Sequence, residues 1–224
     1  MSSAAPPYGE SAASSEATVA QTERALLCDL LDSLGPDALT LAGDWDTHRL
    51  AAHLRLREGN PAQLVKLVLA GGRQQAVEEL VAESDYSQLV SDLRSGPPPV
   101  SLFTLPHVDH HANALEFFVH HEDVRRAQPG WTARELPTWV EDELWARIRV
   151  FAKVLVRRSP VGVELARTDA EDASRVAKKS DPVVVRGLPS EVTLFAFGRA
   201  AVASVELDGS PHAVAAIQAA NFAA

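Results

Sequence analysis

The sequence predicts a mainly α-helical fold, in which a four-helix bundle is followed by a small α/β domain. Three observations support this expectation. Apolar residues recur at helical intervals over most of the chain up to Arg126, and these stretches are separated by modest loops rich in glycine and proline. Short strand-like runs occur only beyond Pro160. Helical stretches joined by modest loops are typical of a bundle, and a later mixture of strands and helices indicates a second domain.

The bundle is predicted from four stretches whose ends carry helix start and stop signals. The first begins at Thr18 and ends at Gly35-Pro36, and the second begins after Asp46-Thr47, bends or stops at Gly59-Asn60-Pro61 and continues through QLVKLVLAGG. Asp and Thr are favourable N-cap residues, whereas proline interrupts a helix. The remaining two stretches are expected to run from Arg73 to about Arg94 and from about Pro106 to Arg126.

The last part of the chain alternates between helical and strand-like patterns. A long helix is expected from Leu136-Pro137 to about Arg158, because proline suits the first helical turn. Strand-like runs follow at VGVELAR, PVVVRG and VASVEL, with a helix expected in SEVTLFAFGRA and another in PHAVAAIQAA. The predicted organisation is a disordered tail over 1–16, a helical bundle over 17–130 and a small α/β domain over 131–224.

Composition narrows the class of protein. An apolar share of 46% in 224 residues is sufficient for a sizeable core, which indicates a globular protein. The formal net charge is −9 and the basic residues are not grouped with aromatic ones, so nucleic-acid binding is disfavoured. Cys28 is the single cysteine and lies in an apolar pattern, which favours a packed side chain over a reactive thiol. No membrane span or secretory signal is readable, so we expect a cytoplasmic protein.

A polar stripe runs along the fourth predicted helix. At about 100° per residue, its members fall within an arc of roughly 80°, and the residues bordering that arc are apolar. Carboxylate and imidazole groups between apolar margins indicate a polar site that faces the inside of the bundle. The stripe consists of Asp109, Asn113, Glu116, His120 and Asp123.

Within this stripe, Glu116 and His120 are four residues apart, a spacing that lets two side chains bind one ion. A third ligand must come from another helix, and His53, which is flanked by leucines in the second stretch, is the best candidate. Two histidines and one glutamate form a typical catalytic zinc set, with the fourth position open to water or substrate. The sequence therefore predicts an open metal site.

Other interpretations of these histidines stay open. An E-x-x-x-H pair occurs often by chance, and His53 could be a core histidine bonded to a backbone carbonyl. His107 and His111 share the four-residue spacing and are rival ligands, although they lie at the start of the helix. His110 and His121 are expected to be surface or interface residues, since no acidic partner lies on their side of the helix.

Two segments resemble a known family. DWDTHRLAAHL and EFFVHHEDVRRA are similar to the metal-binding domain of the mycothiol-dependent maleylpyruvate isomerases, a branch of the DinB-like four-helix bundles. The stretch VHHEDVRRAQPGW is closest to a subgroup of metal-binding proteins without an assigned reaction. The motif positions correspond to His53, Glu116, His120 and Asp123. The segment GLPSEVTLFAFGRA resembles the C-terminal domain of the family, with Arg199 at the position of an arginine that faces the site.

The resemblance implies a metal-dependent, thiol-using enzyme of the isomerase or S-transferase type. Its cofactors would be a divalent metal, with zinc as the expected ion, and mycothiol as the thiol cosubstrate. The metal would hold the thiolate, which would add to a small acidic electrophile. In this picture Asp123 orients a ligand or handles a proton, and Arg199 binds a substrate carboxylate. The expected state is monomer or homodimer. The alternatives are a metal-dependent hydrolase and a non-catalytic metal-binding or interaction module.

Overall fold

The computed structural model describes residue 8 and residues 17–59, 72–97 and 106–220, the side chains of 106–112 excepted. Within these ranges the chain forms two compact units, of which the first ends at Arg134 and the second begins at Glu135. Of the tail expected over 1–16, only Tyr8 is described, and its ring is buried. The other tail residues lie outside the described ranges.

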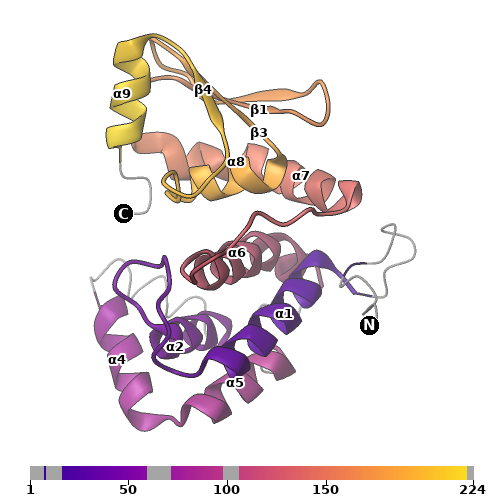
Figure 1. Ribbon diagram of the computed structural model, residues 1–224, viewed down its shortest axis with the longest axis vertical. Helices are drawn as coiled ribbons and strands as arrows, with labels where there is room; N and C mark the ends of the chain where they lie inside the picture. The colour runs from indigo at the N-terminus through magenta and orange to yellow at the C-terminus, as the bar shows by residue number, and fades with distance from the viewer. Residues whose placement is uncertain (1–7, 9–16, 60–71, 98–105, 221–224) are drawn as a thin grey trace. The chain divides into compact units, whose positions relative to one another are not determined.

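The first unit is helical, and α1, α2, α4, α5 and α6 are labelled in Figure 1. α1 packs against α6 and α5, and α2 packs against α5 and α4. Leucines of α1, α2 and α5 form much of the core of the unit, together with Val77 of α4 and Phe117 of α6. The bounds of the helices are Val19–Leu34 for α1, Thr47–Gly59 for α2, Arg73–Glu83 for α4, Tyr86–Ser95 for α5 and Pro106–Arg126 for α6.

Local sequence signals account for the ends of α1. Thr18 and Gln21 form a reciprocal capping box at its start. At its end, Gly35 adopts φ 78° and its N–H donates to the carbonyl of Leu31 at 3.0 Å. Only glycine reaches this left-handed conformation without steric cost, so the helix ends where the sequence predicted.

One predicted helix is wrong: the stretch from Arg73 to about Arg94 is two helices. The chain is extended at Ser84 and Asp85, and the Asp85 carboxylate accepts a hydrogen bond from the N–H of Gln88 at 3.2 Å, which caps α5. An aspartate can start a new helix inside an apolar pattern whose periodicity hardly changes. The continuation of the second stretch beyond Pro61 lies outside the described residues.

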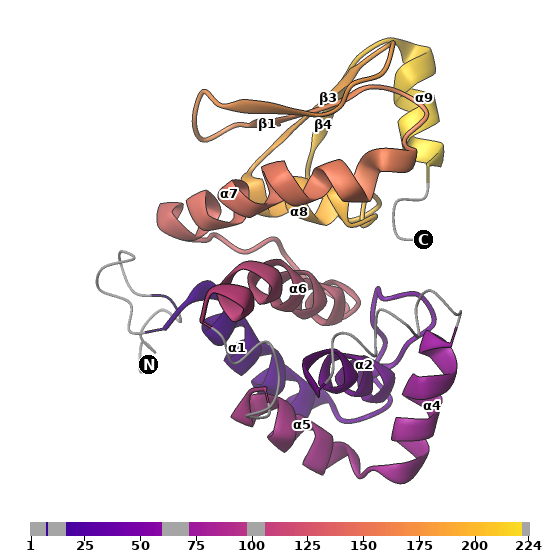
Figure 2. The ribbon, with the colours of Figure 1, turned by 180° about the vertical axis from the view of Figure 1, so that it is seen from behind.

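The second unit combines helices with a small sheet, which agrees with the predicted fold class (Figure 2). The strand order is β2-β1-β3-β4, in which β1 and β3 are parallel and the other two pairs are antiparallel. α7 packs against α8 and β2, and α8 also packs against β1 and β3. The bounds are Thr138–Leu155 for α7, Val163–Arg167 for β1, Ala173–Ala177 for β2, Val183–Gly187 for β3, Pro189–Ala196 for α8, Glu206–Asp208 for β4 and Pro211–Ala219 for α9.

The sheet differs from the expectation in two places. β2 was not predicted, because ASRVA is short and its first three residues are not buried. The run VASVEL contributes only its last two residues to β4, since the chain at residues 202–205 forms turn and coil. Among the described residues, no helix is long and apolar enough to cross a membrane.

Candidate metal centre

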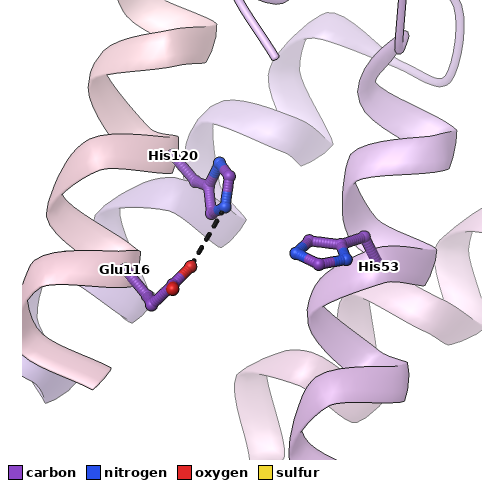
Figure 3. A group of neighbouring side chains, drawn as sticks. All are labelled: His53, Glu116 and His120. Carbon is purple, nitrogen blue, oxygen red and sulfur yellow. Dashed lines mark ion pairs between the residues drawn. The ribbon is translucent and has the colours of Figure 1, made fainter. Parts of the chain in front are cut away.

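α2 and α6 bring the three predicted ligands together (Figure 3). One ligand atom each from His53, Glu116 and His120 lie within 4.8 Å of one another. Metal–ligand bonds of about 2.1 Å separate tetrahedral ligands by roughly 3.4 Å, so small side-chain rotations suffice to close the cluster around an ion. The two imidazole centroids are 5.6 Å apart and their rings are nearly perpendicular. The cluster is the only group with metal-site spacing among the described residues.

His53 has the properties of a ligand. It is 7% exposed, lies between the fully buried Leu50 and Leu54, and its ring contacts Trp45 at a centroid distance of 4.9 Å. Burial and the neighbouring His120 lower the pKa of His53 to about 3, so the imidazole is neutral. Within the described part of the chain, its buried Nδ1 has no hydrogen-bond partner. Figure 3 shows the ring nitrogen farther from the backbone, Nε2, directed toward Glu116 and His120, and a nitrogen of a neutral imidazole is a metal ligand.

Glu116 and His120 form the second half of the cluster. The Oε2 atom of Glu116 lies 3.3 Å from Nε2 of His120. Burial alone would raise the pKa of Glu116, but the Arg57 guanidinium and the hydrogen bond with His120 hold it well below its usual range. Burial opposes protonation of His120, yet hydrogen bonds to Asp123 and Glu116 raise its pKa. The carboxylate is thus ionised, and an ion would replace the His120 proton.

Asp123 lies directly behind His120. Its carboxylate is fully buried, and Oδ2 is 3.0 Å from His120 Nδ1. A carboxylate on Nδ1 fixes the histidine in the tautomer whose Nε2 lone pair faces away from it, here toward Glu116 and His53. Asp123 therefore contacts a proposed ligand and is placed to orient it.

Arg57 and Glu58 were not singled out by the sequence, although both belong to the surroundings of this cluster. Arg57 Nε lies 3.8 Å from Glu116 Oε1, and its Nη1 donates a hydrogen bond to the side-chain oxygen of the fully buried Asn113. Arg57 is four residues beyond His53, one helical turn along α2, and this spacing was the available signal. Asn113 itself was part of the predicted stripe.

The other histidines are placed as follows. The prediction of His121 as a surface or interface residue is wrong: its side chain is buried within the first unit, and its Nδ1 lies 2.5 Å from Oε2 of Glu23 on α1, the acidic partner that the sequence did not reveal. The side chains of His107, His110 and His111 lie outside the described residues, as does that of Asp109 in the stripe. Cys28 is fully buried, and burial raises the pKa of its thiol to about 12, as a packed side chain requires.

Arg199 belongs to the second unit, just beyond α8. Its Nη1 donates to the carbonyl of Phe197 at 2.5 Å, and the side chain is partly exposed. The structure thus brings four of the predicted site residues together in the first unit: His53, Glu116, His120 and Asp123. The fifth, Arg199, belongs to the second unit.

Comparison with known proteins identifies a shared fold. No protein-family model matches the chain, and no curated protein matches it significantly. A crystal structure of a mycothiol-dependent maleylpyruvate isomerase matches with a TM-score of 0.59 and 16% identity, over 85% of this chain and 90% of that chain. A histidine-to-alanine mutant of the mycothiol-dependent maleylpyruvate isomerase matches with a TM-score of 0.57 and 15% identity over the same shares. At this identity the likeness establishes that the chain shares the fold of these isomerases.

Proposed function

We propose that the protein is a metal-dependent, thiol-using enzyme of the mycothiol-dependent isomerase or S-transferase type. The observation that carries the proposal is the cluster of His53, Glu116 and His120, whose ligand atoms lie within 4.8 Å of one another and include the buried, neutral imidazole of His53. The fold shared with mycothiol-dependent maleylpyruvate isomerase supports the choice of thiol chemistry. Zinc is the metal that best suits two imidazoles and one carboxylate.

Three protein ligands are one fewer than a closed structural zinc site contains. When bound, the ion supplies a Lewis-acid position that lowers the pKa of a thiol and makes thiolate available at neutral pH. Asp123 holds His120 in the tautomer that points Nε2 to the cluster, and the ionised Glu116 offsets part of the charge of the ion.

The proposed substrate is a small acidic electrophile with an activated double bond. Attack by the thiolate forms a carbon–sulfur bond and moves the π electrons toward the electron-withdrawing group of the substrate. In an isomerase the carbanion expels the thiolate after rotation about the former double bond. In a transferase the carbanion takes up a proton from water and the carbon–sulfur bond stays. We propose Arg199 as the residue that binds the substrate carboxylate, since a guanidinium can donate two parallel hydrogen bonds to it.

Elemental analysis of purified protein tests the metal site. We expect about one divalent ion per chain in the parent and a loss of most of it in His53→Ala and in His120→Ala. His48→Ala is the matched control, because His48 lies on the same helix and outside the cluster. Full metal content in both ligand variants would contradict the assignment.

Turnover tests the thiol chemistry. We expect the zinc-loaded parent to isomerise maleylpyruvate, or to conjugate a related acidic electrophile, only when mycothiol is present. The apo protein and His120→Ala should be inactive under the same conditions. Hydrolysis of an ester or amide by the zinc form without any thiol would instead support the hydrolase alternative, and metal binding without turnover would support the non-catalytic module.

A further inference from the structure

The two oxygens of the Glu116 carboxylate face different neighbours. Oε2 lies 3.3 Å from Nε2 of His120, on the side of the cluster, whereas Oε1 lies 3.8 Å from Nε of Arg57. Both oxygens of a carboxylate can bind the same ion, and such bidentate binding occupies two coordination positions. The number of Glu116 oxygens that bind the ion therefore decides whether one of its coordination positions stays open for a thiol.

Arg57 is itself held by a buried partner on α6. Its Nη1 donates to the side-chain oxygen of Asn113, and the Asn113 amide nitrogen donates to Oε1 of Glu58 at 3.4 Å. Glu58 also forms an ion pair with Arg24 on α1. Asn113 is fully buried, Glu58 is 1% exposed and the Arg57 side chain is 12% exposed. A side chain anchored in this way cannot leave Glu116 without breaking buried polar contacts.

A simple charge argument alone does not explain this arrangement. A guanidinium near a divalent ion repels it, so the charge of Arg57 lowers the affinity for the metal. Another contribution of Arg57 to the site must offset this cost. Its ion pair with Oε1, the oxygen that is not paired with His120, offers such a role: it can hold this oxygen while Oε2 serves as the ligand. Residues that bind the far side of a metal ligand commonly fix its geometry.

We propose that Arg57 is a positioning residue that retains Oε1 of Glu116, so that Glu116 offers only Oε2 to the metal and one coordination position stays open for the thiol. The hydrogen bond to Asn113 orients the guanidinium of Arg57. The inference rests on the proposed metal site and adds to it the residue that determines how the carboxylate ligates.

Cobalt(II) is the probe, because the visible absorption of bound cobalt reports its coordination number. In Arg57→Gln we expect the visible bands to weaken, as a second carboxylate oxygen joins the ion, and the affinity for added 2-mercaptoethanol to fall at least about tenfold. The matched control is Arg55→Gln: Arg55 lies on the same helix, and its Nε is also 3.8 Å from a carboxylate, that of Asp92 outside the cluster. This control should keep both the spectrum and the thiol affinity of the parent.

Arg57→Lys separates positioning from charge. A lysine keeps the positive charge, but its single ammonium cannot engage Glu116 and Asn113 as the guanidinium does. We expect Arg57→Lys to show the spectral change of Arg57→Gln. If Arg57→Lys instead matches the parent, charge alone explains the effect and the positioning role is wrong. Asn113→Ala, which also keeps the charge, should change the spectrum in the same direction.

The two proposals fail in different ways. A parent protein that binds no cobalt contradicts the metal site and hence the proposed function. A parent that binds cobalt and 2-mercaptoethanol, together with an Arg57→Gln protein of unchanged spectrum and thiol affinity, overturns the role of Arg57 and leaves the metal site intact. Far-UV circular dichroism of each variant establishes that the helices are retained.

Discussion

At the scale of single residues, the pair of His120 and Asp123 determines the direction in which a ligand nitrogen points. Asp123 is fully buried and contacts Nδ1, so Nε2 is the nitrogen that faces the cluster. A neutral amide at this position can accept from Nδ1 with its oxygen, but it carries no charge to stabilise an imidazole polarised by a metal. Both orientation and ligand basicity therefore depend on the carboxylate.

We predict that Asp123→Asn weakens zinc affinity by about 10- to 100-fold, the usual effect of losing such a partner. At saturating zinc the ion should still bind, and thiol-dependent turnover should fall at least about tenfold, or roughly 1.4 kcal/mol of transition-state stabilisation. Competition titration with a chelator and steady-state kinetics measure the two effects. Asp37→Asn, at an exposed position, is the control. Unchanged affinity and turnover would show that Asp123 has no part in the site.

Glu23 is the centre of a second buried polar cluster. It accepts hydrogen bonds from Tyr8 and His121, and it forms an ion pair with Arg134 at 2.9 Å. Burial alone would raise the pKa of Glu23, but the hydrogen bond with His121 and the charge of Arg134 outweigh it and lower the pKa below the ordinary 4.5. A carboxyl whose pKa is lower in the folded state favours folding once it is ionised.

This shift predicts how stability depends on acidity. The contribution of Glu23 is present above its unfolded pKa of about 4.5 and is lost as pH falls toward the lower folded value. Glu23→Gln should therefore unfold at a lower temperature at pH 7, and the difference from the parent should shrink as pH falls below 4.5. Thermal unfolding followed by circular dichroism between pH 3 and pH 7 measures it. Asp29→Asn, on the exposed side of α1, is the control and should unfold at the temperature of the parent. If Glu23→Gln differed from the parent by the same amount at every pH in this range, the prediction would be contradicted.

At the scale of elements, local signals predicted the helices better than they predicted the strands. The capping box at Thr18 and the positive φ of Gly35 define α1 by short-range chemistry that a sequence displays. The strand Ala173–Ala177 depends on what packs against it, so a single sequence carries little sign of it. The break at Asp85 has a local signal, the aspartate cap, but the apolar periodicity on both sides of it suggested one continuous helix.

The candidate site shows the same division. Helical spacing alone predicts that Glu116, His120 and Asp123 share a face, because they lie on one helix. His53 lies on a different helix, and its pairing with them rested on burial and on the resemblance. Arg57 was missed because an arginine near the end of a helix normally reads as a solvated charge. Its ion pair with Glu116 is visible only in the structure, where α2 and α6 bring the two side chains together.

The start of α8 offers an element-scale prediction. The Glu141 carboxylate on α7 accepts hydrogen bonds from both the N–H and the hydroxyl of Ser190, each at 2.8 Å, in the first turn of α8. Removing an acceptor that satisfies buried donors costs about 1 to 3 kcal/mol. We expect Glu141→Ala to lower the free energy of unfolding by this amount in urea titrations. Arg149→Ala, at an exposed position of α7, should change it by less than about 0.5 kcal/mol.

At the scale of the whole molecule, the proposed chemistry is unevenly divided. The metal cluster and its supporting side chains all belong to the unit that ends at Arg134, whereas Arg199 belongs to the unit that begins at Glu135. Metal binding and substrate specificity should therefore respond to different variants. Loss of Arg199 should impair use of an acidic substrate while metal content stays at the level of the parent.

Metal binding should also stabilise one part of the chain directly. An ion held by His53 on α2 and by Glu116 and His120 on α6 links two helices, and an opening that separates them must release it. At a free zinc concentration of about 100 times Kd, linkage predicts about 2.7 kcal/mol of stabilisation, or up to roughly a hundredfold slower exchange of amides exposed by that opening. Hydrogen exchange followed by mass spectrometry should show this slowing in peptides from α2 and α6 of the parent. The same peptides of His53→Ala should exchange at equal rates with and without zinc, because two ligands on one helix do not link it to another. Slowing of equal size in His53→Ala would place the ion elsewhere, and no slowing in the parent at saturating zinc would show that the ion does not join α2 to α6.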